Sequence, residues 1–205
     1  MNTTLLSVFV PTFLFVSATP GMCMTLALTL GMQIGVRRTL WMMAGELVAV
    51  GLVATAAVVG VAAIMLRYPE MFVLMKIGGG LYLFYLGVQL WRSQGNMAVQ
   101  MDAKPRDVSP RALMLQGFVT AIANPKGWAF FIALLPPFID PDHALLPQMT
   151  VLLSLILLIE WLCLMGYALG GRTLSRVLRN SENVALMNRT AGLLMLGVAV
   201  WLVVS

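Results

Sequence analysis

Long apolar runs separated by short polar links dominate the chain. A helix needs about 20 residues to cross the ~30 Å hydrocarbon core of a bilayer. Closed β-barrels show shorter segments of alternating polarity instead. The pattern therefore predicts an all-α integral membrane protein with six transmembrane helices, at residues 5–30, 39–65, 71–91, 112–139, 146–170 and 185–204.

Composition supports this membrane setting. The 205 residues are 60% hydrophobic and 10% charged, whereas soluble domains carry about 25% charged residues. A single core could not bury so much apolar surface. The net charge of +5 is interpreted as an orientation signal and not as a nucleic-acid-binding patch. We do not expect the first apolar run to be a cleaved signal peptide, because it is too long and no basic residue precedes it.

Basic residues lie mainly in the first, third and fifth links between the predicted spans. These residues are Arg37, Arg38, Arg92, Lys104, Arg106, Arg111, Arg172, Arg176, Arg179 and Arg189. The second link has Arg67 beside Glu70, and the fourth has Asp140, Asp142 and His143. Because cytoplasmic loops are rich in Lys and Arg, the odd links are predicted to be cytoplasmic, with both termini on the outer side.

The longest link divides the chain into two halves. Residues 92–111 form a connector containing Gly and Pro, between a first three-helix repeat at 1–91 and a second at 112–205. An odd number of helices per half makes the halves insert in opposite directions, which suits an inverted repeat. The segments "FLFVSATPG" (13–21) and "FVTAIANPK" (118–126) align without gaps and match at their Phe, Ala and Pro residues.

Helix-breaking residues occupy matching places in the first and fourth spans. Pro20-Gly21 and Asn124-Pro125-Lys126 both lie far from a link. A proline leaves a carbonyl without its helical donor, and such a group in the membrane must face protein or a water-filled cavity. Broken helices at corresponding positions predict a substrate site at the midplane, formed by Pro20, Gly21, Asn124, Pro125 and Lys126. The alternative is a pair of plain kinks.

Three charged residues fall inside predicted spans: Lys126, Glu46 and Glu160. Each charge costs about 2.5–3.5 kcal/mol at the bilayer centre, so we expect the residues to face inward and pair. Lys126 is predicted to pair with Glu160 or Glu46, or to bind a substrate carboxylate, and Asn124 to hydrogen-bond the substrate. Either glutamate is a candidate proton carrier or ammonium ligand. The alternative is an ion pair that only fixes helix packing.

The sequence shows no motif for catalysis or nucleotide binding. The one histidine, His143, lies in a link, so no nucleophile–His–acid set is expected inside the membrane, and no P-loop is present. We therefore predict that the protein is not an enzyme and that it needs no cofactor. Several alternatives stay open. They are a membrane thiol/disulfide electron carrier using Cys23 and Cys163, an exporter of a metal ion or another small solute, and a passive channel or a membrane scaffold without transport.

Four stretches of the chain fit together as one family pattern. They are Pro20-Gly21, "GGLYLFYLGVQLWR" (79–92), "NPKGWAFFIALLPPF" (124–138) and "GLLMLGVAVWL" (192–202). With these stretches the chain resembles the LysE/RhtB family of amino-acid exporters. The resemblance implies a multi-pass carrier of the bacterial inner membrane that exports amino acids or close derivatives, energised by the proton gradient. Met22 and Pro137 depart from the usual motifs, where Pro and Gln are common. Glycine-rich helices would also allow a homodimer.

Overall fold

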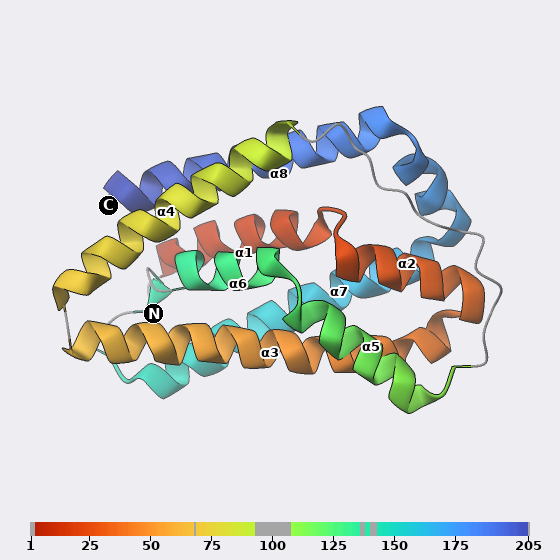
Figure 1. Ribbon diagram of the computed structural model, residues 1–205, viewed down its shortest axis with the longest axis horizontal. Helices are drawn as coiled ribbons and strands as arrows, with labels where there is room; N and C mark the ends of the chain where they lie inside the picture. Colours follow the sequence, from red (N-terminus) through yellow and green to blue (C-terminus); the bar gives the residue numbers. More distant parts are fainter. Residues whose placement is uncertain (1–2, 68, 93–107, 136–137, 140–142, 205) are drawn as a thin grey trace.

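The computed structural model describes residues 3–67, 69–92, 108–135, 138–139 and 143–204, and the side chains of most of these. Within these ranges the regular elements are helices (Figure 1). They are α1 (Thr3–Ala18), α2 (Met22–Ile34), α3 (Val36–Arg67), α4 (Pro69–Arg92), α5 (Pro110–Ile122), α6 (Pro125–Leu134), α7 (Leu145–Arg179) and α8 (Ser181–Val204). The predicted all-α architecture is confirmed.

Among the described residues, three helices are long and apolar enough to cross a membrane on their own. They are α3 over Val36–Gly60, α7 over Leu145–Gly171 and α8 over Ser181–Val200. A fourth candidate is the bent pair of α1 and α2, whose halves meet at 55°. These four correspond to the first, second, fifth and sixth predicted spans. The third and fourth predicted spans coincide with α4 and with α5 plus α6, and their membrane crossing stays a prediction.

The first predicted break lies between α1 and α2. Pro20 has no N–H to continue the helix, and Gly21 is extended, with φ −153° and ψ −175°. The N–H of Thr25 returns to the Gly21 carbonyl at 2.9 Å, so α2 starts afresh just beyond the break. The Thr25 hydroxyl donates to the same carbonyl at 2.7 Å.

The second predicted break separates α5 from α6. The Asn124 N–H donates to the Ala121 carbonyl at 3.1 Å, a tightened turn that ends α5. Pro125 is the first residue of α6, a position where a missing N–H costs nothing and a fixed φ favours the helix. Figure 1 shows both breaks in the middle of the bundle, between the long helices.

Glycines allow the long helices to approach the broken ones closely. At Gly117 of α5 an added Cβ would overlap the Met42 carbonyl of α3, and at Gly45 of α3 it would overlap the Met114 carbonyl of α5. At Gly31 of α2 it would lie 2.5 Å from the Ala168 carbonyl of α7. Small residues at helix crossings permit such backbone contact in membranes. The pairs α3–α5 and α2–α7 are thereby closely packed.

One predicted link proved to be largely helical. The hydrophobic pattern predicts a link after position 170, but α7 continues to Arg179 beyond a kink at Gly171, where φ is 44° and ψ is −132°. Glycine adopts this positive φ readily, so the chain changes direction at Gly171 and is helical on both sides of the kink. The arginines at 172, 176 and 179 therefore lie on a helix.

The chain termini and two of the helix junctions lie at opposite ends of the helical bundle. The start of α1 and the end of α8 lie at the same end of the bundle, opposite the α2–α3 and α7–α8 junctions (Figure 1). Most of the predicted connector, residues 93–107, lies outside the described residues. The division into 1–91 and 112–205 and the inverted repeat stay predictions.

We expect Gly117→Ala to destabilise the protein, because its methyl group would meet the α3 backbone, which cannot move aside like a side chain. Overpacking of this kind costs about 1–3 kcal/mol, and a lower midpoint of thermal unfolding in detergent would report it.

The matched control is Gly197→Ala on α8, where an added Cβ meets nothing within 4 Å. Its midpoint should stay or rise, since alanine is the better helix former. Equal midpoints for the two variants would contradict the close α3–α5 contact.

Candidate functional site

A cavity lies where the two helix breaks meet the long helices. Thr19 and Gly21 line it from the first break, and Asn124 and Gly127 from the second. Its volume is about 60 Å³, which exceeds the ~10–15 Å³ that a cavity needs to hold a water molecule. Both breaks, far apart in sequence, thus face one small chamber.

Glu46 contributes a carboxyl group to this cavity from α3. Its side chain is 0% exposed, and neither carboxylate oxygen has a hydrogen-bond partner among the described residues. Its neighbour Gly45 brings α3 against α5, which holds this part of α3 beside the second break. Buried polar groups usually find partners, so an unpartnered carboxyl lining a cavity indicates a place for a ligand.

Glu160 brings the second carboxyl group from α7. The Ser17 hydroxyl of α1 donates to its Oε2 atom at 2.6 Å. The Glu160 and Glu46 carboxyl groups lie close enough to interact electrostatically. The cavity therefore contains two acidic groups in each other's field, one of them oriented by a hydroxyl from the broken helix.

Two aromatic side chains supply donors to carbonyls at the breaks. The Tyr167 hydroxyl of α7 donates to the Ala18 carbonyl, the last residue of α1, at 2.7 Å. The indole N–H of Trp128 donates to the Ile122 carbonyl, the last residue of α5, at 2.9 Å. The final carbonyls of a helix have no donors within it, so these side chains replace the bonds that the breaks remove.

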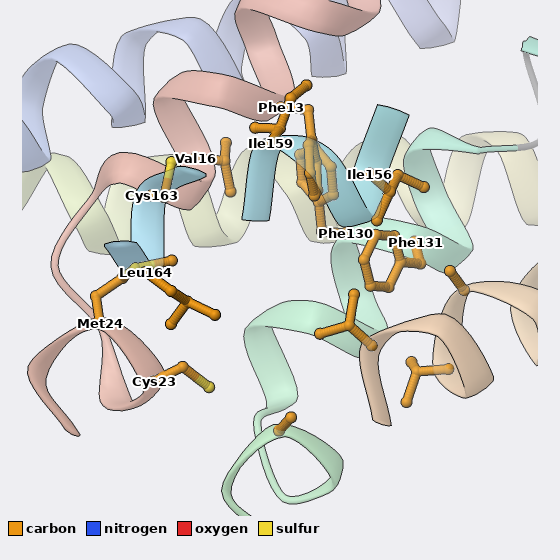
Figure 2. Packing of buried hydrophobic residues seen from close by; sticks show 14 of the residues in the cluster. Phe13, Val16, Cys23, Met24, Phe130, Phe131, Ile156, Ile159, Cys163 and Leu164 are labelled. Carbon is orange, nitrogen blue, oxygen red and sulfur yellow. The ribbon is translucent and has the colours of Figure 1, made fainter. Parts of the chain in front are cut away.

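The rest of the cavity wall is apolar and partly aromatic. Figure 2 shows Phe13 of α1 gathered with Phe130 and Phe131 of α6. The Phe13 ring centroid lies 5.5 Å from that of Phe130 and 5.9 Å from that of Phe131. Val50 and Val53 of α3 also line the cavity. A molecule that fits this site should combine a cationic group with apolar surface.

The structure brings most of the predicted site residues together. Gly21, Asn124, Glu46 and Glu160 all line the cavity, and Pro20 is buried at the first break. Pro125 and Lys126 begin α6 beside the cavity, at the second break.

The side chains of Pro125 and Lys126 lie outside the described part of the structure. The predicted pairing of Lys126 with a glutamate therefore stays a prediction. Their place at the start of α6 follows from the helix bounds alone.

Sequence reasoning missed Ser17, Tyr167 and the Trp128 contact. For Ser17 and Tyr167 the sequence contains a signal that indicates a place near the site. Ser17 is a polar residue three positions before Pro20, and Tyr167 follows Glu160 by seven positions, which places both on one face of α7. The Trp128 bond reaches back across the break to Ile122, and no periodic pattern indicates such a contact.

Neither the thiol/disulfide carrier nor the metal exporter gains support from the described residues. Cys23 on α2 and Cys163 on α7 are buried and form no disulfide. Among the described residues no group of three or more His, Cys, Asp or Glu side chains is placed to hold a metal ion. The polar side chains lining the cavity supply two carboxyl groups, two hydroxyls, an amide and one thiol, from Glu46, Glu160, Ser17, Thr19, Asn124 and Cys23.

Comparison with known families gives one match over most of the chain. A model for the LysE type translocator matches residues 14–205. This confirms the resemblance found in the sequence. Translocators move solutes and are not enzymes, so the non-enzyme prediction is confirmed as well. No solved structure matches the chain.

Several bacterial membrane proteins are similar over nearly their whole length. An uncharacterized membrane protein of Vibrio cholerae is 27% identical over 181 residues, covering 88% of this chain and 87% of that protein. A homoserine/homoserine lactone efflux protein of Salmonella typhimurium is 25% identical over 176 residues, covering 86% and 84%. A leucine efflux protein of Klebsiella pneumoniae is 26% identical over 188 residues, covering 90% and 88%.

We expect Glu46→Met to raise the midpoint of thermal unfolding in detergent at neutral pH. The substitution replaces a buried carboxyl group that has no described partner with an apolar side chain of similar size. Removing an unsatisfied buried polar group stabilises a protein by about 1–3 kcal/mol, at the expense of function where the group is used.

Leu47→Met, one position along α3, is the control for introducing methionine and should change the midpoint little. A midpoint that falls in Glu46→Met but not in the control would contradict the prediction, because it would mean that Glu46 has a charge partner.

Proposed function

This chain belongs to the family of LysE type translocators, and we propose that it is a secondary transporter that exports amino acids or close derivatives from the cytoplasm. The observation that carries the proposal is the cavity shared by both helix breaks, Glu46 and Glu160. Relatives named for the efflux of homoserine, homoserine lactone and leucine support an amino-acid-like substrate. All three molecules carry a primary amine.

The polar groups of the cavity divide into sites for the two ends of an amino acid. Glu46 and Glu160 bind the substrate ammonium, since a charge-assisted hydrogen bond is strong in a site shielded from water. Asn124 lines the same cavity and hydrogen-bonds the substrate. Lys126 and the N-terminal end of α6 attract the substrate carboxylate, because helix N-termini favour anions.

The same pair of carboxyl groups gives a route to proton antiport. An ionised carboxylate without a partner is costly in a protein interior, so Glu46 holds either a proton or a substrate ammonium. Two neighbouring carboxylates also repel each other when both are ionised. Substrate and proton therefore compete for one site, which is the requirement for exchanging one against the other.

Movement of one half against the other then alternates access to the site. The odd links face the cytoplasm and the termini face outward, in line with their charges. The setting is the bacterial inner membrane. A homodimer is compatible with the apolar outer faces of the helices.

Transport in proteoliposomes with an imposed proton gradient tests this function. Leucine, homoserine and homoserine lactone are the first substrates to examine. We expect the wild-type protein to accumulate at least one amino acid in the acidic compartment, because in antiport protons leave that compartment as the amino acid enters it. Glu46→Gln should lower this rate about tenfold or more, since a charge-assisted bond is worth about 1.5–3 kcal/mol.

Glu182→Gln is the matched control, because Glu182 is exposed in the first turn of α8. Its transport rate should equal that of the wild type. Flux that does not respond to the proton gradient would contradict antiport. Full activity of Glu46→Gln would contradict the role of the cavity, and unchanged substrate affinity in Lys126→Met would contradict the carboxylate site.

A further inference from the structure

The last turn of α1 is attached to α7 by two hydrogen bonds. The Ser17 hydroxyl donates to Glu160 Oε2 at 2.6 Å, and the Tyr167 hydroxyl donates to the Ala18 carbonyl at 2.7 Å. Ser17 and Ala18 are neighbours in the chain, while Glu160 and Tyr167 lie two helical turns apart on one face of α7. The end of the broken helix is therefore held at two points.

The break itself creates the need for the Tyr167 bond. In a continuous helix the Ala18 carbonyl would accept from the N–H of Met22, four residues on. Here Met22 begins α2, which departs at 55° from α1. A carbonyl without a donor costs several kcal/mol in a membrane interior, and Tyr167 provides the donor. Its side chain is 6% exposed, so water does not easily replace it.

The second break is stabilised differently. Trp128 belongs to α6, and it donates to Ile122 only six residues away, across its own break. That bond fixes the local turn between α5 and α6. The Tyr167 bond joins residues 149 positions apart, so it ties the first break to a separate long helix. Loss of the Tyr167 bond would leave the Ser17–Glu160 bond as the one remaining hydrogen bond of these two between the end of α1 and α7.

We propose that Tyr167 is a positioning residue for transport: its hydroxyl holds the end of α1 so that Ser17 can orient Glu160 in the substrate cavity. This inference rests on the proposed function. Tyr167 itself does not line the cavity, whereas Ser17 and Glu160 do. It acts through them, by keeping the first break closed against α7.

Thiol labelling tests the position of α1 without measuring transport. Cys23 lies two residues beyond the first break, lines the cavity and is 5% exposed. With Cys163 replaced by Ser, it is the one remaining thiol. Tyr167→Phe removes only the hydroxyl. We expect Cys23 to react with N-ethylmaleimide about fivefold faster in this variant, as loss of one net hydrogen bond predicts.

Tyr82→Phe is the matched control, because Tyr82 is exposed on α4 and far from the breaks in sequence. The labelling rate of Cys23 in this control should equal the rate in protein that carries only the Cys163→Ser substitution. Thermal unfolding of each variant in detergent checks that the fold is retained. Equal labelling of Cys23 in Tyr167→Phe and Tyr82→Phe would overturn the proposal.

The pH profile of transport tests the link to Glu160. If Tyr167 acts through Ser17, then Tyr167→Phe and Ser17→Ala shift the profile in the same direction, and the double variant shifts it no further. Two residues that act as one unit show such non-additivity. A lower rate with an unshifted profile would overturn the positioning role and leave only a structural one.

The two proposals fail in different ways. If the wild type exports no amino acid, the proposed function fails, while the labelling rates still decide whether Tyr167 holds α1. If amino-acid transport is present but Tyr167→Phe matches the control in labelling and pH profile, the positioning role fails alone.

Discussion

The cost of an unpaired polar group in a low-dielectric interior governs the centre of this protein. Each broken helix leaves carbonyls that have lost their helical donors, and hydrocarbon offers no replacement. The structure meets this cost with Tyr167 at the first break and Trp128 at the second. Glu46 is the exception, since its carboxyl oxygens accept no hydrogen bond from the described residues. Stabilised breaks surrounding one unsatisfied acid are typical of a binding site, where local stability is given up for function.

The surrounding helices make this arrangement possible. Glycine contacts bring α3 against α5 and α2 against α7, so each broken helix is packed on a long helix. Both carboxyl groups come from these long helices, whereas Ser17 and Asn124 come from the ends of the broken ones. Acidic groups on the long helices thus meet polar groups from the two breaks in one cavity. The apolar wall of Phe13 and its neighbours limits the water that can weaken these contacts.

The sequence alone predicts the all-α membrane architecture, both breaks and the two acids, because these depend on hydrophobic length, proline chemistry and the cost of buried charge. It does not predict that α7 continues as a helix beyond Gly171, because a segment rich in arginine at the end of an apolar run is interpreted as a link between spans. The sequence also does not predict the Ser17–Glu160 and Tyr167–Ala18 hydrogen bonds. They join residues more than 140 positions apart, and only tertiary packing brings such partners together.

The most direct test of the central claim is whether a transported amino acid protects Cys23 from alkylation. The measurement uses N-ethylmaleimide on protein in which Cys163 is replaced by Ser, with and without a saturating concentration of that amino acid. Because Cys23 lines the same cavity as Glu46 and Glu160, a bound substrate should slow its alkylation, and an amino acid that is not transported should have no effect. Unchanged alkylation at saturating concentrations of a transported amino acid would contradict the assignment of this cavity as the transport site.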